Sequence, residues 1–272
     1  MLSDQRQYEM TEFICREGKA GIAELAKRFG VSGETVRRDL TVIAKGGRIR
    51  KVHGGAVAVR HAIRDESYAV RRVQSYESKQ RIGEYAARLL RDNDIIGIDA
   101  GTCAEGFARA IYHVQNLTVV THSLPVATIL AGKIAAGELS GQVILPGGTL
   151  ESETCNLHGL STVAQLKRYR LDKAFISATA VSELGIMTSS EEDGLLAATL
   201  LGRAESAYVL AESEKLDKES FYLAATPEEL RGLITDDQHP ISDGLLQALK
   251  ENGVELSVVP VGGERRAEKE DS

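Results

Sequence analysis

Residues 30–40, GVSGETVRRDL, follow a glycine break with the start of a short amphipathic helix. Ser32 is a good N-cap, because its hydroxyl can accept a backbone N–H that the first helical turn leaves unbonded. Val36 and Leu40 lie on one apolar face at helical spacing. At about 100° per residue, Arg38 lies nearly opposite that face. The stretch therefore predicts a helix that points an arginine away from its own core.

Two further helices are predicted before it. Residues 5–17 and residues 22–29 each carry apolar side chains at i, i+3 and i+4 spacing, and Gly30 ends the second of these helices. Two helices joined by a short turn with glycine, the second beginning with small polar residues, are typical of a helix-turn-helix. In that motif the early residues of the second helix reach base edges in the major groove of DNA.

A basic hairpin is predicted next. Residues 48–56, RIRKVHGGA, alternate basic and apolar side chains and then reach Gly54 and Gly55, which close the hairpin. A basic wing of this kind usually contacts phosphate or the minor groove, which positions a protein on DNA without specifying a sequence. The N-terminal part of the chain therefore reads as a winged helix-turn-helix domain.

The charge of the chain is distributed unevenly. The formal net charge is −6, yet residues 1–60 carry 12 Lys and Arg against 7 Asp and Glu, a balance of +5. The other residues carry 21 against 32, a balance of −11. A basic head on an acidic body indicates that only the head meets a polyanion.

A small helical packing domain with merely solvated charges is the alternative to DNA binding. An isolated Arg-Arg pair would favour that alternative, but here the three helices, the N-cap, the basic wing and the local charge occur together. We therefore expect the head to bind double-stranded operator DNA. The residues expected to contact it are Ser32, Glu34, Thr35, Arg37, Arg38, Thr41, Lys45, Arg48, Arg50, Lys51 and His53.

The rest of the chain alternates apolar runs with amphipathic segments, which predicts an α/β domain with a mainly parallel sheet. The expected strands are residues 95–100, 117–121, 142–147, 173–178, 207–211 and 232–236, and the expected helices include residues 78–92, 161–169 and 194–204. The predicted boundaries are residues 1–57 for the head, 58–77 for a polar linker, 78–260 for the body and 261–272 for a disordered tail.

Polar loops follow three of the expected strands. In open α/β sheets ligands bind beyond the carboxyl ends of the strands, and a glycine loop that leads into a helix offers backbone N–H groups to an anion. Residues 99–103, 121–123 and 147–149 fit this description. One such loop is more often a plain turn, but three in one sheet favour a small anionic ligand.

The remaining polar residues predict neither a metal nor a cofactor. His122 and His158 lack metal-ligand spacing, so hydrogen-bonding roles are expected, and the acidic runs 151–153 and 191–193 read as solvated loop charges. Three widely spaced cysteines, without a CxxC motif, indicate neither a disulfide framework nor a zinc site. With no apolar run long enough for a membrane span, a cytoplasmic protein is expected.

The head resembles the DNA-binding domain of the DeoR family of bacterial transcriptional regulators. The family's Val-Ser, Thr-(Ile/Val)-Arg-Arg-Asp-Leu and Arg-Val-His-Gly-Gly-Ala are met at residues 31–32, 35–40 and 51–56, with Lys51 in place of the first arginine of the last run. The resemblance extends through the body. It implies a sensor domain similar in fold to ribose-5-phosphate isomerase and CoA-transferase enzymes, which binds phosphorylated sugars or polyols.

The resemblance also implies a set of effector-binding residues. They are Asp99, Gly101, Thr102, Cys103, Thr121, His122, Ser123, Gly147, Gly148 and Lys215. Cys103 occupies the position of a threonine in the family, and His122 occupies that of an asparagine. Residues 197–198 are Ala-Ala where many members have Lys-Arg. The phosphate-type loops are thus retained better than the part of the pocket that faces the sugar.

Two functions remain to be weighed. The first is a repressor of a sugar or polyol catabolic operon, relieved by a phosphorylated effector and assembled as a dimer or a higher even oligomer. The second is a sugar-phosphate isomerase or deaminase-like enzyme with an accessory DNA-binding head. An isomerase needs a general base beside an acidic carbon of its substrate, and the strand-end loops offer no convincing one. The sequence therefore favours the regulator.

Overall fold

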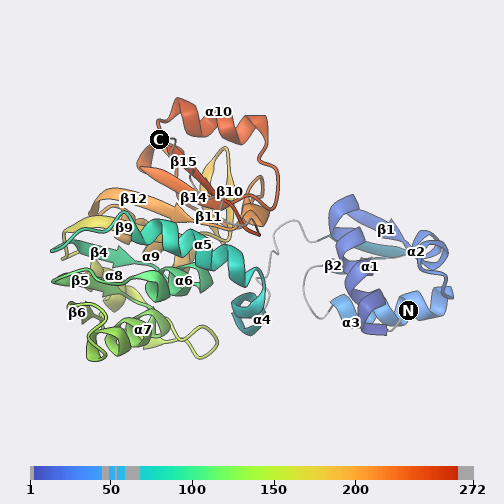
Figure 1. Ribbon diagram of the computed structural model, residues 1–272. Coiled ribbons are helices and arrows are strands. Elements are labelled where there is room, and N and C mark those ends of the chain that lie inside the picture. The colour runs from blue at the N-terminus through green and yellow to red at the C-terminus, as the bar shows by residue number, and fades with distance from the viewer. Residues whose placement is uncertain (1–2, 45–48, 53, 59–67, 263–272) are drawn as a thin grey trace. The chain divides into compact units, whose positions relative to one another are not determined.

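The computed structural model describes residues 3–44, 49–52, 54–58 and 68–262, which form two compact units that divide between Asp65 and Glu66 (Figure 1). Each unit has its own hydrophobic core. The predicted DNA contacts Lys45, Arg48 and His53, and the predicted tail from residue 263 onward, lie outside the described residues.

The N-terminal unit has three helices and a small antiparallel sheet. Its elements are α1 (Ser3–Glu17), β1 (Lys19–Gly21), α2 (Ile22–Phe29), α3 (Gly33–Ile43), β2 (Ile49–Val52) and β3 (Gly55–Ala58). The sheet order is β1-β3-β2, so the predicted hairpin is confirmed and gains a third strand. β1 was not predicted, because three residues are too few to show the alternation of a strand.

Local interactions explain the helix boundaries of this unit. Gly30 adopts a left-handed conformation with φ of 64° and ends α2, while Ser32 Oγ accepts the Thr35 N–H at 3.1 Å and begins α3. Val36 and Leu40 are fully buried, as their spacing predicted, whereas Arg38 is exposed. The helix-turn-helix is therefore present with its arginine outward.

A buried carboxylate ties α3 to α1. Asp39 lies beside Leu40 on α3 and accepts hydrogen bonds from Arg6 Nε and Gln7 Nε2, each at 2.8 Å. Burial alone would raise the pKa of Asp39, but the hydrogen bonds and the charge of Arg6 outweigh burial and lower the pKa. Sequence reasoning missed this contact, because nothing in residues 5–17 shows which of its polar side chains faces α3.

The second unit is built on a parallel sheet of seven strands with the order β15-β14-β12-β9-β4-β5-β6. The strands are β4 (Ile95–Ile98), β5 (Leu117–Thr121), β6 (Gly141–Ile144), β9 (Leu171–Ser177), β12 (Ala204–Leu210), β14 (Gly232–Asp236) and β15 (Glu255–Val259). All six neighbouring pairs are parallel, which confirms the predicted sheet.

Helices cover both faces of this sheet and bury a separate core on each. One core contains side chains of α5 (Tyr76–Ala87), α6 (Thr102–Ala110) and α7 (Leu124–Ala135). The other contains side chains of α8 (Leu160–Leu166), α9 (Glu191–Leu201) and α10 (Asp243–Glu251). Burial on both faces explains why the central strands are continuous apolar runs rather than alternating ones.

Three features of this unit were not predicted. They are β15 at one edge of the sheet, the antiparallel sheet β10 (Ala180–Ser182), β11 (Gly185–Thr188) and β13 (Tyr222–Ala225), and the hairpin of β7 (Thr149–Leu150) and β8 (Leu157–His158). Two-residue to four-residue strands give too little pattern, and β15 is half-exposed at the sheet edge, so its apolar run is interrupted.

The predicted linker ends earlier than expected. Within residues 58–77, Tyr68–Val73 form helix α4, which lies beside α6 in the second unit. The sequence YAVRRV reads as polar, and the acidic partner of its Arg72 is Glu105, which lies on α6 rather than nearby in the chain. Among the described residues, no helix is long and apolar enough to cross a membrane.

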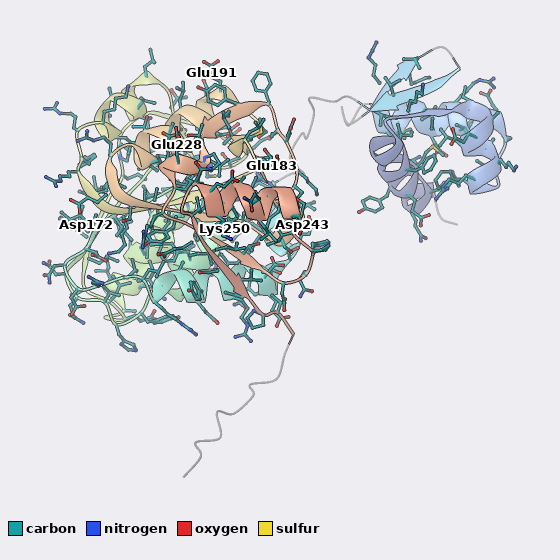
Figure 2. All side chains as sticks on the ribbon, turned by 90° about the horizontal axis from the view of Figure 1, so that it is seen from above. Asp172, Glu183, Glu191, Glu228, Asp243 and Lys250 are labelled. Carbon is teal, nitrogen blue, oxygen red and sulfur yellow. The ribbon has the colours of Figure 1, made fainter. Side chains whose placement is uncertain are left out.

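The acidic excess of the second unit lies on its surface. Figure 2 labels Glu183, Glu191, Glu228 and Asp243, all of which are exposed. Exposed charges of one sign repel a polyanion over a distance of about 10 Å at 0.1 M salt. This surface is thus unsuited to DNA, in contrast to the basic N-terminal unit.

The Asp39 contact generates a test of the head. Asp39→Asn removes the charge that Arg6 pairs with in a buried position and should lower the opening free energy of α1 and α3 by about 1–3 kcal/mol. Because the pKa of Asp39 is lowered in the folded state, the wild-type advantage should be full above the ordinary Asp pKa of about 4 and should be lost as the pH falls below it.

Native-state hydrogen exchange of the α1 and α3 amides in the full chain measures this opening free energy. The method reports on the N-terminal unit by itself, so the two units need not unfold in one transition. Glu34→Gln is the matched control, because Glu34 is exposed and its ion pair to Arg37, at 3.4 Å, lies at the surface. Equal protection in Asp39→Asn and in the control would contradict the role given to this carboxylate.

Candidate functional site

The order in which the chain adds strands to the parallel sheet reverses between β4 and β9. From β4 the chain adds β5 and β6 on one side and later adds β9, β12, β14 and β15 on the other. In open α/β sheets the loops at such a reversal of strand order diverge, and ligands bind in the crevice between them, which places the expected crevice here between the carboxyl ends of β4 and β9. Residues 99–103, predicted to bind an anion, leave β4 at this point.

Asp99 spans the crevice. Its Oδ2 accepts the backbone N–H of Ser177, at the end of β9, at 3.1 Å. Its Oδ1 lies 2.9 Å from Nε2 of His122, which follows β5. A carboxylate only accepts hydrogen bonds, so Nε2 carries a proton and donates it to Asp99, and Nδ1 is left without a hydrogen-bond partner. Asp99 thereby fixes the ends of three neighbouring strands and the orientation of His122.

Helix α6 starts at the same place. Gly101, at its N-cap, has φ of 120°, a conformation that side chains rarely adopt, and a Cβ there would lie 3.1 Å from Ser177 Oγ. Thr102 is the first helical residue. The first backbone N–H groups of a helix have no partner within the helix, and the helix dipole favours negative charge beside them. The predicted phosphate loop therefore has the geometry of an anion site.

The opposite wall carries two histidines. The hairpin of β7 and β8 is bound to the end of β5, since Leu157 N–H donates to the His122 carbonyl at 2.8 Å. This contact brings the His158 ring to 6.4 Å from the His122 ring, edge to face. Nδ1 of His122, Nε2 of His158 and Oγ of Ser177 are buried without a hydrogen-bond partner. Buried polar atoms without partners cost free energy, so these three atoms are suited to a polar ligand.

One acidic residue in this wall corrects a prediction. Residues 191–193 were expected to be solvated loop charges, but they form the first turn of α9, and Asp193 lies 3.7 Å from Nε2 of His158. Ser190 caps α9 by accepting the Asp193 N–H at 3.1 Å. Burial raises the pKa of Asp193. The signal was present in the sequence, because Ser followed three residues later by an acid before an apolar run is typical of a helix start.

The other predicted effector residues after β5 hold the backbone. Thr121 Oγ1 accepts the Ser123 N–H at 3.1 Å, and Ser123 Oγ accepts the Val126 N–H at 3.5 Å as the N-cap of α7. Thr121 and Ser123 are both buried. Their side chains thus shape the loop that presents His122.

The paired glycines pack against α8. Gly147 N–H donates to Gln165 Oε1 at 3.1 Å, and a Cβ on Gly148 would lie 2.0 Å from Thr162 Oγ1. Close packing against α8 therefore explains why glycine occupies position 148. Effector binding by Gly147 and Gly148 stays a prediction, and the structure gives them a separate packing role.

Cys103 and Lys215 meet at a buried carboxylate that sequence reasoning missed. Glu212 Oε2 accepts the Cys103 thiol at 3.0 Å and lies 2.9 Å from Lys215 Nζ. Glu212 Oε1 lies 2.8 Å from Lys79 Nζ on α5. Burial raises the pKa of the Cys103 thiol, which therefore stays protonated and donates its hydrogen. The sulfur of Cys103 faces Glu212, so only its backbone N–H belongs to the anion site.

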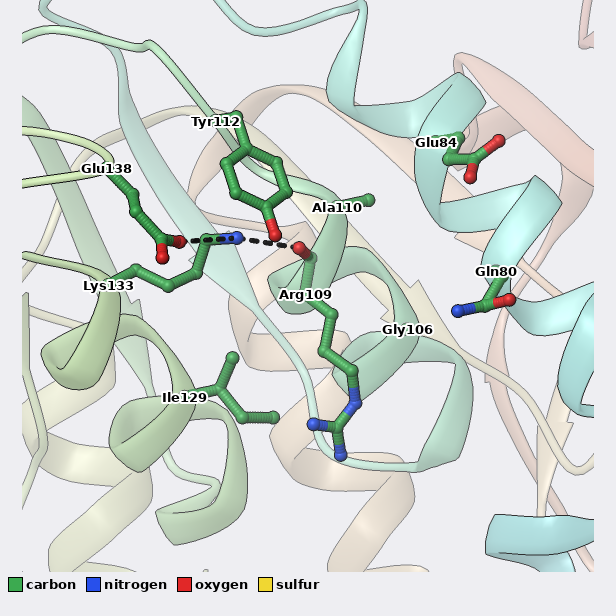
Figure 3. A pocket seen from close by; sticks show the side chains of 9 residues that line it. All are labelled: Gln80, Glu84, Gly106, Arg109, Ala110, Tyr112, Ile129, Lys133 and Glu138. Carbon is green, nitrogen blue, oxygen red and sulfur yellow. Dashed lines mark hydrogen bonds and ion pairs between the residues drawn. The ribbon is translucent and has the colours of Figure 1, made fainter. Parts of the chain in front are cut away.

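A separate pocket lies elsewhere in the second unit. It has a volume of about 550 Å³ and lies among α5, α6 and α7 near the C-terminal end of α6 (Figure 3). Lys133 Nζ there donates to the Arg109 carbonyl at 2.7 Å, pairs with Glu138 at 3.4 Å and faces the Tyr112 ring. Its lysine is already paired and a helix C-terminus repels anions, so this pocket is not suited to a phosphate.

The predicted DNA-contacting residues lie on α3 and the wing. Arg38 and Arg50 are exposed, whereas Arg37 lies 3.4 Å from Glu34. Lys51 Nζ donates to Thr41 Oγ1 at 2.7 Å, which connects the wing to α3. Thr35 Oγ1 lies 2.9 Å from Ser32 Oγ, so those hydroxyls stabilise the helix start. Arg38 therefore projects from the helix, while the carboxylates of Asp39 and Glu34 form their ion pairs with Arg6 and Arg37.

Comparison with known proteins gives the same division of the chain. The DeoR-like helix-turn-helix domain matches residues 6–62, and the DeoR C terminal sensor domain matches residues 74–237. The sensor unit is similar in fold to ribose 5-phosphate isomerase A from Methanocaldococcus jannaschii, with a TM-score of 0.35 and 17% identity over 52% of this chain and 54% of that one.

Two curated relatives match almost from end to end. The HTH-type transcriptional repressor GlcR of Bacillus subtilis (strain 168) is 32% identical over 258 residues, which cover 95% of this chain and 97% of GlcR. The lactose phosphotransferase system repressor of Streptococcus mutans is 33% identical over 250 residues, which cover 92% and 97% of the two chains. Since the sensor-domain match alone spans more than half of the chain, this protein belongs to the DeoR family of transcriptional regulators.

Proposed function

We propose that this protein represses a sugar or polyol catabolic operon and leaves its operator when a phosphorylated sugar or polyol binds to the second unit. One observation carries the effector half of the proposal. Three buried polar atoms without partners, on His122, His158 and Ser177, surround the crevice into which the N-terminus of α6 also opens. That combination suits a ligand with an anionic end and several hydroxyl groups.

The chemistry of the crevice divides the ligand into two ends. The free N–H groups at Thr102 and Cys103 and the Thr102 hydroxyl would bind the phosphate, because a helix N-terminus favours an anion. The acceptor Nδ1 of His122 and the hydroxyl of Ser177 would bind sugar hydroxyl groups. The name of one relative supports the ligand class, since it is a lactose phosphotransferase system repressor.

The same geometry argues against the enzyme alternative. The oxygens of Asp99 are directed at His122 Nε2 and at the Ser177 N–H, and these two hydrogen bonds fix the carboxylate in place. Each oxygen keeps a second lone pair, but a general base must also lie about 2.6–3.2 Å from the substrate proton that it removes. Asp99 is therefore better suited to orienting His122 than to proton transfer, and we propose that the protein is not an enzyme.

The DNA half of the proposal requires more than one copy of the chain. One helix-turn-helix covers a single half-site, and dimers read two half-sites about one helical turn apart. We propose a homodimer or a higher even oligomer that assembles through the acidic second unit, since the exposed face of the head is used for DNA. Light scattering at micromolar concentration tests this, and a monomer both with and without DNA would contradict it.

Arg38→Ala is the first test of the DNA half. Arg38 is exposed on the recognition helix, and a bidentate arginine–guanine contact gives about 1–3 kcal/mol of discrimination. We expect the variant to lose about 5- to 150-fold in affinity for an operator selected by the parent protein from random DNA, with little change for unrelated DNA. Fluorescence anisotropy with both DNAs measures the ratio.

Lys51→Ala serves as the comparison. A residue that contacts phosphate should weaken binding to all sequences alike and reduce the slope of log affinity against log salt by about 1. If Arg38→Ala instead lowered operator and unrelated DNA binding equally, the assignment of α3 as the base-reading helix would be wrong.

Thr102→Val is the test of the effector half. It removes one hydroxyl from the start of α6 and should weaken a phosphate ligand by about 1.5–3 kcal/mol, the usual range for a hydrogen bond to a charged group. We expect the parent to release its operator when glucose 6-phosphate, fructose 1-phosphate or glycerol 3-phosphate is added, and the variant to need at least tenfold more of the same ligand.

Thr128→Val is the matched control, because Thr128 lies on α7 and its hydroxyl donates only to the Leu124 carbonyl within that helix, at 2.8 Å. Inorganic phosphate tests the anionic end of the ligand alone, and unphosphorylated glucose tests the sugar end alone. A parent protein that no phosphorylated sugar or polyol releases from DNA would overturn the proposed function.

A further inference from the structure

Helix α4 is the first described element of the sensor unit, and in the sequence it follows residues 59–67, which join the two units. Its Tyr68 hydroxyl donates to Glu105 Oε1, and its Arg72 Nε lies 3.4 Å from Glu105 Oε2. Glu105 lies in the first turn of α6, and its side chain is only 4% exposed. A short helix beside the interdomain segment is thus bound to the helix that begins the proposed phosphate site.

A second contact holds the other end of α4. Lys79 Nζ, on α5, donates to the carbonyl groups of Arg71, at 2.8 Å, and Gln74. These carbonyls belong to the last turn of α4 and to the residue after it, which the helix itself leaves unbonded. Ser75, the junction between α4 and α5, has φ of 48°, a conformation that non-glycine residues seldom adopt. The end of α4 therefore depends on the position of one buried ammonium group.

Lys79 is connected to the effector site through Glu212. Glu212 Oε1 pairs with Lys79 at 2.8 Å, while its Oε2 pairs with Lys215 at 2.9 Å and accepts the thiol of Cys103, the second residue of α6. Burial opposes a charge on Glu212, but Lys215 and Lys79 outweigh it and hold the pKa of Glu212 well below its usual range. These three ionised groups therefore leave one positive charge in excess.

Helices α5 and α6 are also in direct backbone contact. A Cβ on Gly83 of α5 would lie 2.6 Å from the carbonyl carbon of Gly106 on α6, and one on Gly106 would lie 2.7 Å from the Lys79 carbonyl oxygen. No side chains separate the two helices at this crossing. A small displacement of the start of α6 is consequently transferred to α5 and to Lys79 rather than being absorbed by flexible side chains.

We propose that α4 is a latch that transmits effector binding to the DNA-binding head, closed by Glu105 at its first turn and by Lys79 at its last. The inference rests on the proposed function and adds the route by which that site controls DNA binding. In the closed state Tyr68 and Arg72 are held on α6, and Lys79 holds the carbonyl groups of Arg71 and Gln74 at the end of α4.

An anionic ligand opens this latch by competition for charge. A phosphate at the N-terminus of α6 pairs with Lys215, which at present pairs with Glu212. Glu212, having lost one of its two cations, keeps Lys79 as its remaining cation, and the Lys79 ammonium shifts its hydrogen bonds from the Arg71 and Gln74 carbonyls toward both Glu212 oxygens. The added negative charge also lies within one turn of Glu105. Both effects favour release of α4, and a ligand with this preference shifts the equilibrium toward the open state.

The test uses the full chain with Tyr68→Phe and Arg72→Gln combined. Both side chains belong to α4, outside the effector crevice, and Arg72 is half-exposed, so the sensor core should stay folded. Operator affinity is measured with and without the panel ligand that releases the parent, and binding of the same ligand is measured by calorimetry. We expect ligand affinity within about threefold of the parent, while the 5- to 150-fold response of operator affinity typical of allosteric coupling falls to less than about twofold.

Two controls make the result specific. Arg81→Gln removes an exposed ion pair on α5, to Glu84 at 3.2 Å, and should keep the full response. Arg72→Lys, which preserves the charge beside Glu105, should restore most of the response in a chain that also carries Tyr68→Phe. Hydrogen exchange of residues 68–73 gives an independent readout, and the ligand should accelerate it in the parent.

The outcomes separate the two proposals. A parent that responds to a phosphorylated ligand together with a double variant that responds equally would overturn the latch and leave the proposed function in place. Unchanged exchange of residues 68–73 in a responding parent would also overturn the latch. A parent that responds to no member of the panel would overturn the proposed function and this inference with it.

Discussion

The sensor unit depends on the two hydrogen bonds that the carboxylate of Asp99 accepts, one on each oxygen. A parallel sheet that grows in both directions from β4 leaves a crevice where its loops diverge, and a crevice between polar strand ends needs something to hold its sides. Asp99 does so, because its two oxygens accept hydrogen bonds from Ser177 on β9 and from His122 after β5. The start of α6, the tautomer of His122 and the place of the β7–β8 hairpin all follow from this bridge.

Buried charged side chains are the second organising feature, and their ion-pair partners lie on several helices. Glu105 and Glu212 are both almost fully buried, yet each has basic partners: Arg72 and Arg109 for the first, Lys79 and Lys215 for the second. Pairs of this kind are costly to break and contribute little net stability when intact. These pairs specify how the helices are arranged, because α4, α5 and α6 can pair all of these charges at the same time in only a few arrangements.

A buried carboxylate with a basic partner also organises the N-terminal unit. Asp39 faces inward and joins α3 to α1 through Arg6, while Arg38, one residue before it, faces outward. At about 100° per residue, neighbouring positions on a helix must diverge in this way. The Arg-Arg-Asp sequence therefore combines an outward-facing arginine with the residue that fixes the helix carrying it, and a shift of Asp39 would turn Arg38 as well.

Much of this protein could be determined from its sequence. Helix periodicity, the Ser32 cap and the glycine at position 30 predicted the helix-turn-helix, and six apolar runs predicted the central parallel strands, because these signals are local and period-dependent. The loops after β4 and β5 were also identified, since polar residues directly after a buried strand stand out. Only the tertiary structure decided which side chains meet: Asp39 with Arg6, His158 with His122, Glu212 with Lys79, and α4 with Glu105. These pairs are separated by 33 or more residues in the chain, and contacts between distant segments leave no periodic trace in a single sequence. They arise when the packing of helices on the sheet brings buried charges to their partners.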